Sequence, residues 1–288
     1  MRALAQFVMR GPLQAAGVSV VTMAIPLLFW IGAAVIGLVI LRLGLRQGVN
    51  IGIWALLPAL GWATVGGDPT SLAVLMIVVV MTAILRTRGS WERALLTASV
   101  MTIVIGLLLP VMYPAMLEQL VQTGVSFYQQ YNAEVARELG DQLEPVIRQT
   151  MNASMAGTFL VAGVVLTMLA RSWQAKLYNP GGFREEFHAF RLSGPSGIVC
   201  VLAMVGGSLL GLNPVLVVWA AGFPMVVAAI ALVHGVVGLR NMGTQWLVIF
   251  YIALLILGPS LLLLLVVLAF VDSWLDIRGR IRPAGPAE

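Results

Sequence analysis

The sequence predicts an all-α protein: a polytopic integral membrane helical bundle of 8–9 transmembrane helices with an outer amphipathic helical segment. Of the 288 residues, 60% are hydrophobic and only 10% are charged, whereas about a quarter of the residues in an average soluble domain are charged. Long apolar stretches alternate with short polar loops, and about 20 apolar residues are enough for one helical crossing of a bilayer. The basic residues gather in alternate loops, and a basic excess near a span marks the cytoplasmic face.

The first five crossings follow the apolar pattern up to Tyr113. Residues 5–43 have room for two crossings separated by a tight turn at Pro26, and arginines at both ends of this stretch place the N-terminus in the cytoplasm. Gly66-Gly67-Asp68-Pro69 has the composition of a turn and predicts a link between two short crossings on the outer side. The third, fourth and fifth crossings are expected at residues 51–65, 71–85 and 93–113.

Residues 115–150 form the predicted outer amphipathic segment. Apolar residues recur there mostly at every third or fourth position, which is typical of an amphipathic helix. Its acidic residues outnumber its basic ones, a balance that suits the outer face. Gly140 and Pro145 are expected to interrupt the segment and to divide it into two helices.

A sixth crossing, residues 153–170, is expected to return the chain to the cytoplasm at a polar island, residues 171–195. Phe183, Phe187 and Phe190 recur in the island at helical spacing and predict a short helix that lies in the membrane interface. Aromatic and basic side chains together also bind anionic headgroups or partner helices. The alternative is that the island only anchors the flanking crossings. The residues predicted to dock a partner or a lipid are Trp173, Tyr178, Arg184, Phe187 and Arg191.

The seventh and eighth crossings, expected at 198–212 and 214–238, are followed by a ninth apolar block, residues 245–271. One kinked crossing of this block would leave the arginines near the C-terminus outside, against the usual charge rule. A re-entrant hairpin at Gly258-Pro259 would keep them inside, but each half would have only about 14 residues, which is short for a crossing. We favour the single kinked crossing. Residues 1–275 then form one membrane domain, followed by a polar tail at 276–288.

Three local features occur together in this chain: a proline-centred hairpin at the start, a cytoplasmic loop of arginine-rich and aromatic residues, and an aspartate-arginine signature near the C-terminus. Together they resemble the YybS-like family of uncharacterised bacterial inner-membrane proteins. That family is distantly similar to the substrate-binding S components of energy-coupling-factor transporters. The resemblance implies the bacterial inner membrane, an outward-facing binding cavity and cytoplasmic partner proteins, and it identifies no substrate. The matching stretches are Leu4 to Ile51, Trp173 to Arg191, and Asn213 through Asp272, Trp274, Asp276 and Arg278.

Residues that carry catalysis or bind cofactors are scarce in this sequence. The chain has two histidines and one cysteine, Cys200, and none of them has the spacing of a zinc site. No glycine pair is followed by the lysine and hydroxyl residue of a phosphate-binding loop. We therefore expect no metal, no cofactor, no intrinsic ATPase and no other enzyme activity. The net charge of +5 resides in short loops, which favours a topology signal over nucleic-acid binding.

Three polar residues in or near the crossings are predicted to bind a ligand: His234, Asn213 and Gln14. Polar groups inside membranes are often functional, and the alternative for each is a bond to a neighbouring helix or exposure at the membrane surface. Short, broken crossings and the family resemblance lead to the hypothesis that the protein binds and moves a small molecule or lipid in a helix-lined cavity. The alternative is a non-transporting scaffold. The expected partners are membrane lipids and a membrane or cytoplasmic protein.

Overall fold

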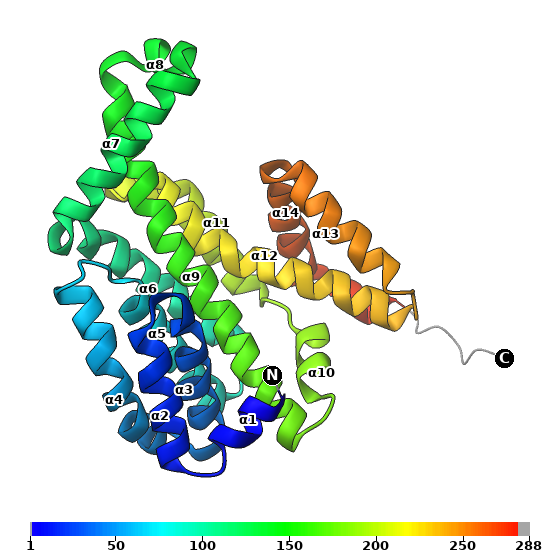
Figure 1. The fold of residues 1–288 in the computed structure, drawn as a ribbon. Coiled ribbons are helices and arrows are strands. Elements are labelled where there is room, and N and C mark those ends of the chain that lie inside the picture. The colour runs from blue at the N-terminus through cyan, green and yellow to red at the C-terminus, as the bar shows by residue number, and fades with distance from the viewer. Residues whose placement is uncertain (1, 282–288) are drawn as a thin grey trace.

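The computed structural model describes residues 2–281, and this part of the chain folds into helices joined by short turns, without a strand (Figure 1). The predicted all-α class is confirmed. Five helical stretches are long and apolar enough to cross a membrane, and a sixth is counted if the bent pair Gly182–Ala189 and Gly194–Leu210 is one span. Helix length and composition therefore do not confirm 8–9 crossings. The five stretches are Pro26–Leu43, Thr70–Arg88, Trp91–Met112, Ala133–Tyr178 and Pro214–Leu239.

The helices follow one another with connections of only a few residues. Short 3-10 turns are labelled η1 (Pro26–Leu28), η2 (Gly140–Gln142) and η3 (Gly207–Leu210). The α-helices are α1 (Arg2–Val8), α2 (Pro12–Ala24), α3 (Phe29–Leu43), α4 (Leu45–Thr64), α5 (Thr70–Arg88), α6 (Trp91–Met112), α7 (Pro114–Tyr131), α8 (Ala133–Leu139), α9 (Leu143–Tyr178), α10 (Gly182–Ala189), α11 (Gly194–Gly206), α12 (Pro214–Leu239), α13 (Gln245–Leu257), α14 (Pro259–Leu275) and α15 (Ile277–Arg280).

The predicted turn at Pro26 is present between α2 and α3. Ile25 has an extended backbone with φ −105° and ψ 114°, as the residue before a proline prefers, and Pro26 then begins η1. The indole nitrogen of Trp62 in α4 donates to the carbonyl oxygen of Ala24 at 3.2 Å. This bond holds the end of α2 against the end of α4.

α3 lies inside the bundle. Every residue from Gly32 to Leu41 is buried, and this continuous apolar sequence is typical of a helix surrounded by others. A Cβ built on Gly37 would lie 3.0 Å from Ala170 Cβ in α9 and 3.1 Å from Val78 Cγ1 in α5. Small residues therefore let α3, α5 and α9 approach closely.

α9 joins the predicted outer segment and the predicted sixth crossing into one helix of 36 residues, about 54 Å long at 1.5 Å per residue. The expected interruption at Gly140 is present, with φ 49° at the start of η2. The one at Pro145 is absent, because this proline lies in the first turn of α9, where its missing N–H has no intrahelical partner to lose. α9 then continues through Arg171 to Tyr178, so the first half of the island is the end of a span helix.

The two ends of the bundle differ in charge. At one end, Arg86 of α5 donates to the carbonyl oxygen of Leu41 in α3 at 2.6 Å, and at the other end Asn152 of α9 donates to a backbone oxygen of α6 at 2.9 Å. At the acidic end, the α7–α8–α9 hairpin projects in Figure 1, and this hairpin contains Arg137 and Arg148 among five carboxylates. The arginine-rich end comprises Arg2, Arg10, Arg42, Arg46, Arg86, Arg88, Arg93, Arg171, Lys176, Arg184, Arg191, Arg240, Arg278 and Arg280.

The last apolar block is a hairpin rather than one kinked crossing. Gly258 has φ 47°, a conformation that glycine adopts without strain, and the chain reverses there between α13 and α14 (Figure 1). Tyr251 of α13 bonds His234 near the end of α12, and Asp272 of α14 returns to the same end, where it bonds Arg278. The favoured single crossing is therefore wrong. The hairpin alternative keeps the C-terminal arginines at the arginine-rich end, in agreement with the charge rule.

We predict that Gly157→Ala destabilises the protein. A Cβ at Gly157 in α9 would lie 2.5 Å from Cδ2 of the rigid Trp219 ring in α12, and such overpacking costs about 1–3 kcal/mol. Thermal unfolding of the purified protein in detergent measures the loss. The matched control is Gly61→Ala in α4, where nothing lies within 4 Å of the new Cβ and alanine is favoured by about 0.5–1 kcal/mol in a helix. An equal decrease in both variants would contradict close α9–α12 packing.

Candidate functional site

α10 is the short helix predicted in the second half of the island. Gly181, with φ 91°, provides the left-handed residue that separates it from α9. Phe183 stacks on Phe187 with ring centroids 6.0 Å apart, and Phe187 meets His234 of α12 edge to face at 5.5 Å. The apolar side of α10 therefore packs against the bundle, while Arg184 is exposed. Phe190 lies just beyond the helix in an extended conformation and is buried.

Two glycines of α12 allow α10 to approach. A Cβ on Gly235 would lie 2.7 Å from the carbonyl oxygen of His188. One on Gly238 would lie 2.8 Å from Nδ1 of the same histidine. Because these glycines are three residues apart, they share one face of α12. α10 is also tied to α9, since Arg171 Nε donates to Glu186 Oε2 at 3.0 Å.

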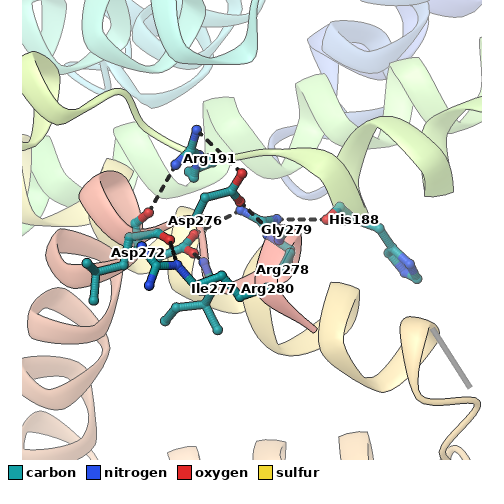
Figure 2. Close-up of polar contacts among 9 residues, drawn as sticks. His188, Arg191, Asp272, Asp276, Ile277, Arg278, Gly279 and Arg280 are labelled. Atoms are coloured by element: carbon teal, nitrogen blue, oxygen red, sulfur yellow. Dashed lines mark hydrogen bonds and ion pairs between the residues drawn. The ribbon is translucent and has the colours of Figure 1, made fainter. Parts of the chain in front are cut away.

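A buried ion pair attaches the C-terminal segment to α10 (Figure 2). Arg278 Nη2 donates to Asp272 Oδ2 at 2.9 Å, and their side chains are only 9% and 2% exposed. The other terminal nitrogen of Arg278 donates to the His188 carbonyl oxygen at 2.7 Å. Asp272 Oδ1 accepts from the backbone N–H of Ile277 at 2.9 Å. The part of the predicted polar tail that the structure describes is therefore docked against the bundle.

Arg191 adds a second connection to the same segment. It donates to the backbone oxygen of Asp272 at 3.3 Å and lies 4.0 Å from Asp276 Oδ2 (Figure 2). Asp276 has φ 46° and caps α15 by accepting from the N–H of Gly279. The ring of His188 points away from this network in Figure 2. Arg191 and the backbone of His188 thus belong to the network, and the His188 ring faces another space.

Two adjoining cavities surround Arg184 and His188 at the arginine-rich end. The larger has a volume of about 830 Å³ and lies between α10, α12 and α15; it contains three guanidinium groups, from Arg184, Arg191 and Arg278, and the carboxylates of Glu185 and Asp276. The smaller, about 520 Å³, extends past His188 toward the start of α13. Arg184, His188 and Gly238 line both cavities. The smaller cavity is also lined by His234, Val237, Asn241, Met242, Thr244 and Leu247.

Arg184 is the cation of these cavities that is left for a ligand. The charge of Arg278 is compensated by buried Asp272, and Arg191 faces Asp276. Arg184 has no ion pair with a described residue. An exposed guanidinium offers five N–H donors in a planar fork, which matches a phosphate or carboxylate group. The site is therefore suited to bind an anionic group, and among residues 2–281 no cluster of three or more His, Cys, Asp or Glu side chains could hold a metal ion.

The structure brings four predicted site residues together: Arg184, Phe187, Arg191 and His234. His234 Nε2 lies 2.9 Å from the hydroxyl oxygen of Tyr251, so this histidine bonds a neighbouring helix and also lines the smaller cavity. Its ring centroid is 6.1 Å from that of His188. The only two histidines of the sequence are thus neighbours.

The other predicted residues lie elsewhere. Trp173, expected to dock a partner or lipid, is 1% exposed and packs among α1, α3 and α9, so this prediction is wrong. Tyr178 lies under the guanidinium of Arg42 at 4.1 Å. Asn213 caps α12 by accepting from the N–H groups of Val215 and Leu216 at the acidic end. Gln14 lies on α2 and lines neither of the two cavities.

Several residues of the site were not predicted as functional. The sequence pattern does not single out His188, and it marks Asp272 and Arg278 only as an aspartate-arginine signature near the C-terminus. The glycines at 235 and 238 provide a sequence signal, because two small residues three apart in an apolar helix permit close packing. The Asp272–Arg278 pair has no comparable signal, since its burial depends on α10 and α12, which lie far away in the sequence.

Comparison with known proteins identifies no relative: no family model, no curated protein and no solved structure matches the chain. The resemblance to the YybS-like family therefore stays a prediction. The function has to be argued from the geometry of the site.

We predict that Arg278→Gln destabilises the protein strongly. The substitution leaves the Asp272 carboxylate buried without its partner, and loss of one member of a buried ion pair costs about 3–5 kcal/mol. Thermal unfolding in detergent measures this change. The matched control is Arg280→Gln, two residues away and exposed, which should change stability by no more than about 1 kcal/mol. A similar loss of stability in Arg278→Gln and Arg280→Gln would show that the Asp272–Arg278 pair is not the contact that holds the C-terminal segment against the bundle.

Proposed function

We propose that this chain is a multi-pass membrane protein that binds an anionic lipid headgroup, or an anionic amphiphilic small molecule, between α10 and α12. The observation that carries the proposal is the pair of adjoining cavities around Arg184 and His188 at the arginine-rich end. The bound molecule moves between this site and the surrounding membrane. The protein does this without an ATPase or other enzymatic activity of its own.

The position of the cavities at the end of apolar helices supports an amphiphilic ligand. Leu247 of α13 lines the smaller cavity, and α13 has no buried residue. The apolar surface of α13 therefore continues directly from the cavity. An anionic group can bind Arg184 while an acyl chain lies along α13, which keeps both parts of an amphiphile in a suitable environment.

The charge distribution supports an orientation with the arginine-rich end in the cytoplasm. In this orientation α2, α3, α4, α5, α6, α9, α11 with η3, and α12 make eight crossings. The α13–α14 hairpin enters and leaves the membrane from the cytoplasmic side, because the chain reverses at Gly258 and both ends of the hairpin contact the arginine-rich end through Tyr251 and Asp272. The N-terminus and residue 281 then both lie in the cytoplasm. The resemblance to a bacterial family supports the inner membrane.

The scaffold alternative has less support from the positions of the predicted docking residues. Trp173 is buried, and Phe187 packs against Phe183 and His234. A docking surface that includes Phe187 would require α10 to leave the bundle, and Trp173 is covered by α1 and α3. The exposed charges of α10 instead border the cavities.

We predict that the protein binds phosphatidylglycerol more tightly than phosphatidylcholine, and that Arg184→Gln weakens phosphatidylglycerol binding about ten-fold or more. A hydrogen bond to a charged group contributes about 1.5–3 kcal/mol, and 1.4 kcal/mol corresponds to a factor of ten in affinity. Titration of the purified full-length protein with each lipid, followed by native mass spectrometry, measures the affinities.

The control for this experiment is Arg46→Gln. Arg46 is exposed, lies at the same end of the molecule and lines neither cavity. It should leave phosphatidylglycerol binding unchanged. If Arg46→Gln weakens binding as much as Arg184→Gln, the attraction is a general effect of positive charge and the proposed site is incorrect. Equal affinities of the unsubstituted protein for phosphatidylglycerol and phosphatidylcholine would also show that the proposed site is incorrect.

We predict on which side of the membrane single cysteines lie when they are introduced one at a time into the Cys200→Ala variant. A cysteine at Ser126 in α7 should react with a membrane-impermeant maleimide added to intact cells. Cysteines at Lys176 and Arg280 should react only after the membrane is opened, because both positions lie at the arginine-rich end. All three positions are exposed in the folded protein. Labelling of position 280 from outside would restore the single kinked crossing and would exclude the hairpin.

A further inference from the structure

A third cavity lies at the acidic end, opposite the site described above. Its volume is about 560 Å³, and it is formed where α6, α7, α9 and the start of α12 meet. Apolar and polar side chains both contribute to its walls. The lining residues are Pro110, Pro114, Ala115, Leu117, Glu118, Arg148, Gln149, Asn152 and Asn213.

Asn152 offers this cavity a hydrogen-bond acceptor that the protein does not use. Its Nδ2 donates to the carbonyl oxygen of Gly106 in α6 at 2.9 Å, and this bond fixes which way the amide points. The other atom of the amide, Oδ1, is shielded from solvent and has no donor among the described residues. A buried acceptor without a donor is costly. A ligand with N–H or O–H groups would satisfy it once the atoms that cover Oδ1 move aside.

The charged groups of the cavity also favour a ligand that donates hydrogen bonds. Arg148 donates to Glu118 at 2.7 Å and to Glu144 at 2.6 Å, so one guanidinium faces two carboxylates. Glu118 also accepts from Gln122 at 2.7 Å. The bonds from Gln122 and then from Arg148 hold the pKa of Glu118 below its usual value, so this carboxylate is ionised at neutral pH. The group of three carries a net negative charge.

Asn213 shapes the cavity but has no free acceptor for the N–H groups of a ligand. Its Oδ1 accepts from the N–H groups of Val215 and Leu216, and its Nδ2 donates to the carbonyl oxygen of Gln149 at 2.7 Å. Asn152 and Glu118, rather than the predicted Asn213, therefore provide the acceptors for a ligand at this end. Asn213 positions α12 against α9.

The apolar side of the cavity continues onto the surface of α6. Pro110 and Leu117 line it, and the adjoining Val111 and Met112 are 75% and 62% exposed. These residues end a helix that is long and apolar enough to cross a membrane. A ligand with an acyl chain next to its polar group fits this boundary better than a soluble amine.

We infer that this cavity binds the headgroup of a membrane lipid that carries a primary ammonium group. The N–H donors of the ammonium bind Asn152 Oδ1 and the Glu118 carboxylate. The ligand chemistry is opposite to that of the cavities around Arg184. The two sites share no lining residue, so either can be present without the other.

The first test compares phosphatidylethanolamine with phosphatidylcholine. The two headgroups have the same phosphate and the same net charge, but the quaternary ammonium of phosphatidylcholine has no N–H donor. Native mass spectrometry of the full-length protein in detergent should show about ten-fold tighter binding of phosphatidylethanolamine. Equal affinities would overturn the inference, because the cavity would then not recognise N–H groups.

Two substitutions locate the preference. Asn152→Leu should abolish the preference for phosphatidylethanolamine. Glu118→Gln should reduce it about two- to five-fold, since this carboxylate is partly exposed. Asn50→Leu on the exposed side of α4 is the matched control and should retain the preference. Glu118→Gln removes no apolar contact of α9 and leaves Arg148 paired with Glu144, so it tests the site even if Asn152→Leu does not fold. Retention of the full preference in the folded variants would overturn the inference.

Competition with free ethanolamine distinguishes the source of the ammonium group. Binding of phosphatidylethanolamine that persists in millimolar ethanolamine supports a lipid site. Displacement by ethanolamine at that concentration would assign the cavity to a soluble amine and would overturn the lipid assignment. Phosphatidylglycerol binding at Arg184, measured in the same samples, should be unaffected by Glu118→Gln, which separates this test from that of the proposed function.

Discussion

Close packing around α9 is the constraint on which the rest of the structure depends. Hydrocarbon provides no hydrophobic driving force between helices, so their association depends on van der Waals contact and on small residues that allow it. α9 has glycine where the Trp219 ring of α12 and Ile77 of α5 approach its backbone, at Gly157 and Gly163. It extends from the acidic end, where it contributes Asn152, to the arginine-rich end, where Arg171 binds Glu186. The cavity at the acidic end is lined by α9 itself, and at the arginine-rich end α9 holds α10, which lines the two cavities there.

The two ends use charge in different ways. At the arginine-rich end, the Asp272–Arg278 pair is almost fully buried and structural, and Arg184 is the one Arg, Lys, Asp or Glu side chain among the described residues that line the smaller cavity. At the acidic end, Arg148 is shared by two carboxylates, and the remaining negative charge determines the ligand. Burial of a compensated pair contributes little to ligand binding, because its charges are already satisfied. The uncompensated charge at each end therefore sets the chemistry that the end can recognise.

Much of the fold can be predicted from the sequence because it depends on local patterns. The turn at Pro26, the link at Gly66–Pro69 and the break at Gly140 follow from residues that favour turns, and the helices follow from apolar length. The continuity of α9 through Pro145 was missed because a proline is tolerated in a first turn, and the sequence alone does not show where that turn begins. The charge rule favours the hairpin at Gly258, but each half of the hairpin is short for a crossing, and this led to the prediction of one kinked crossing.

The candidate site was less predictable, since burial and partners depend on contacts between distant segments. Arg184, Phe187, Arg191 and His234 could be selected as polar or aromatic residues near apolar blocks. Trp173 has the same local character as an interfacial tryptophan, and only the packing of α1 and α3 on α9 shows that it is buried. Asp272 and Arg278 resemble a solvated signature in sequence. They become a buried pair because α14 returns to α10. Gly258-Pro259 and the charge rule permit that return, but they do not show which helix the pair meets.

The short helices connect the fold to the chemistry of the arginine-rich end. α13 and α14 reverse direction at Gly258, so both of their outer ends stay at the arginine-rich end. The exposed leucines Leu255 and Leu263 near Gly258 then face acyl chains. Since α13 also borders the cavity at His234, its surface connects a polar pocket to the hydrocarbon without a polar barrier. That connection suits an amphiphile and gives a soluble anion no advantage.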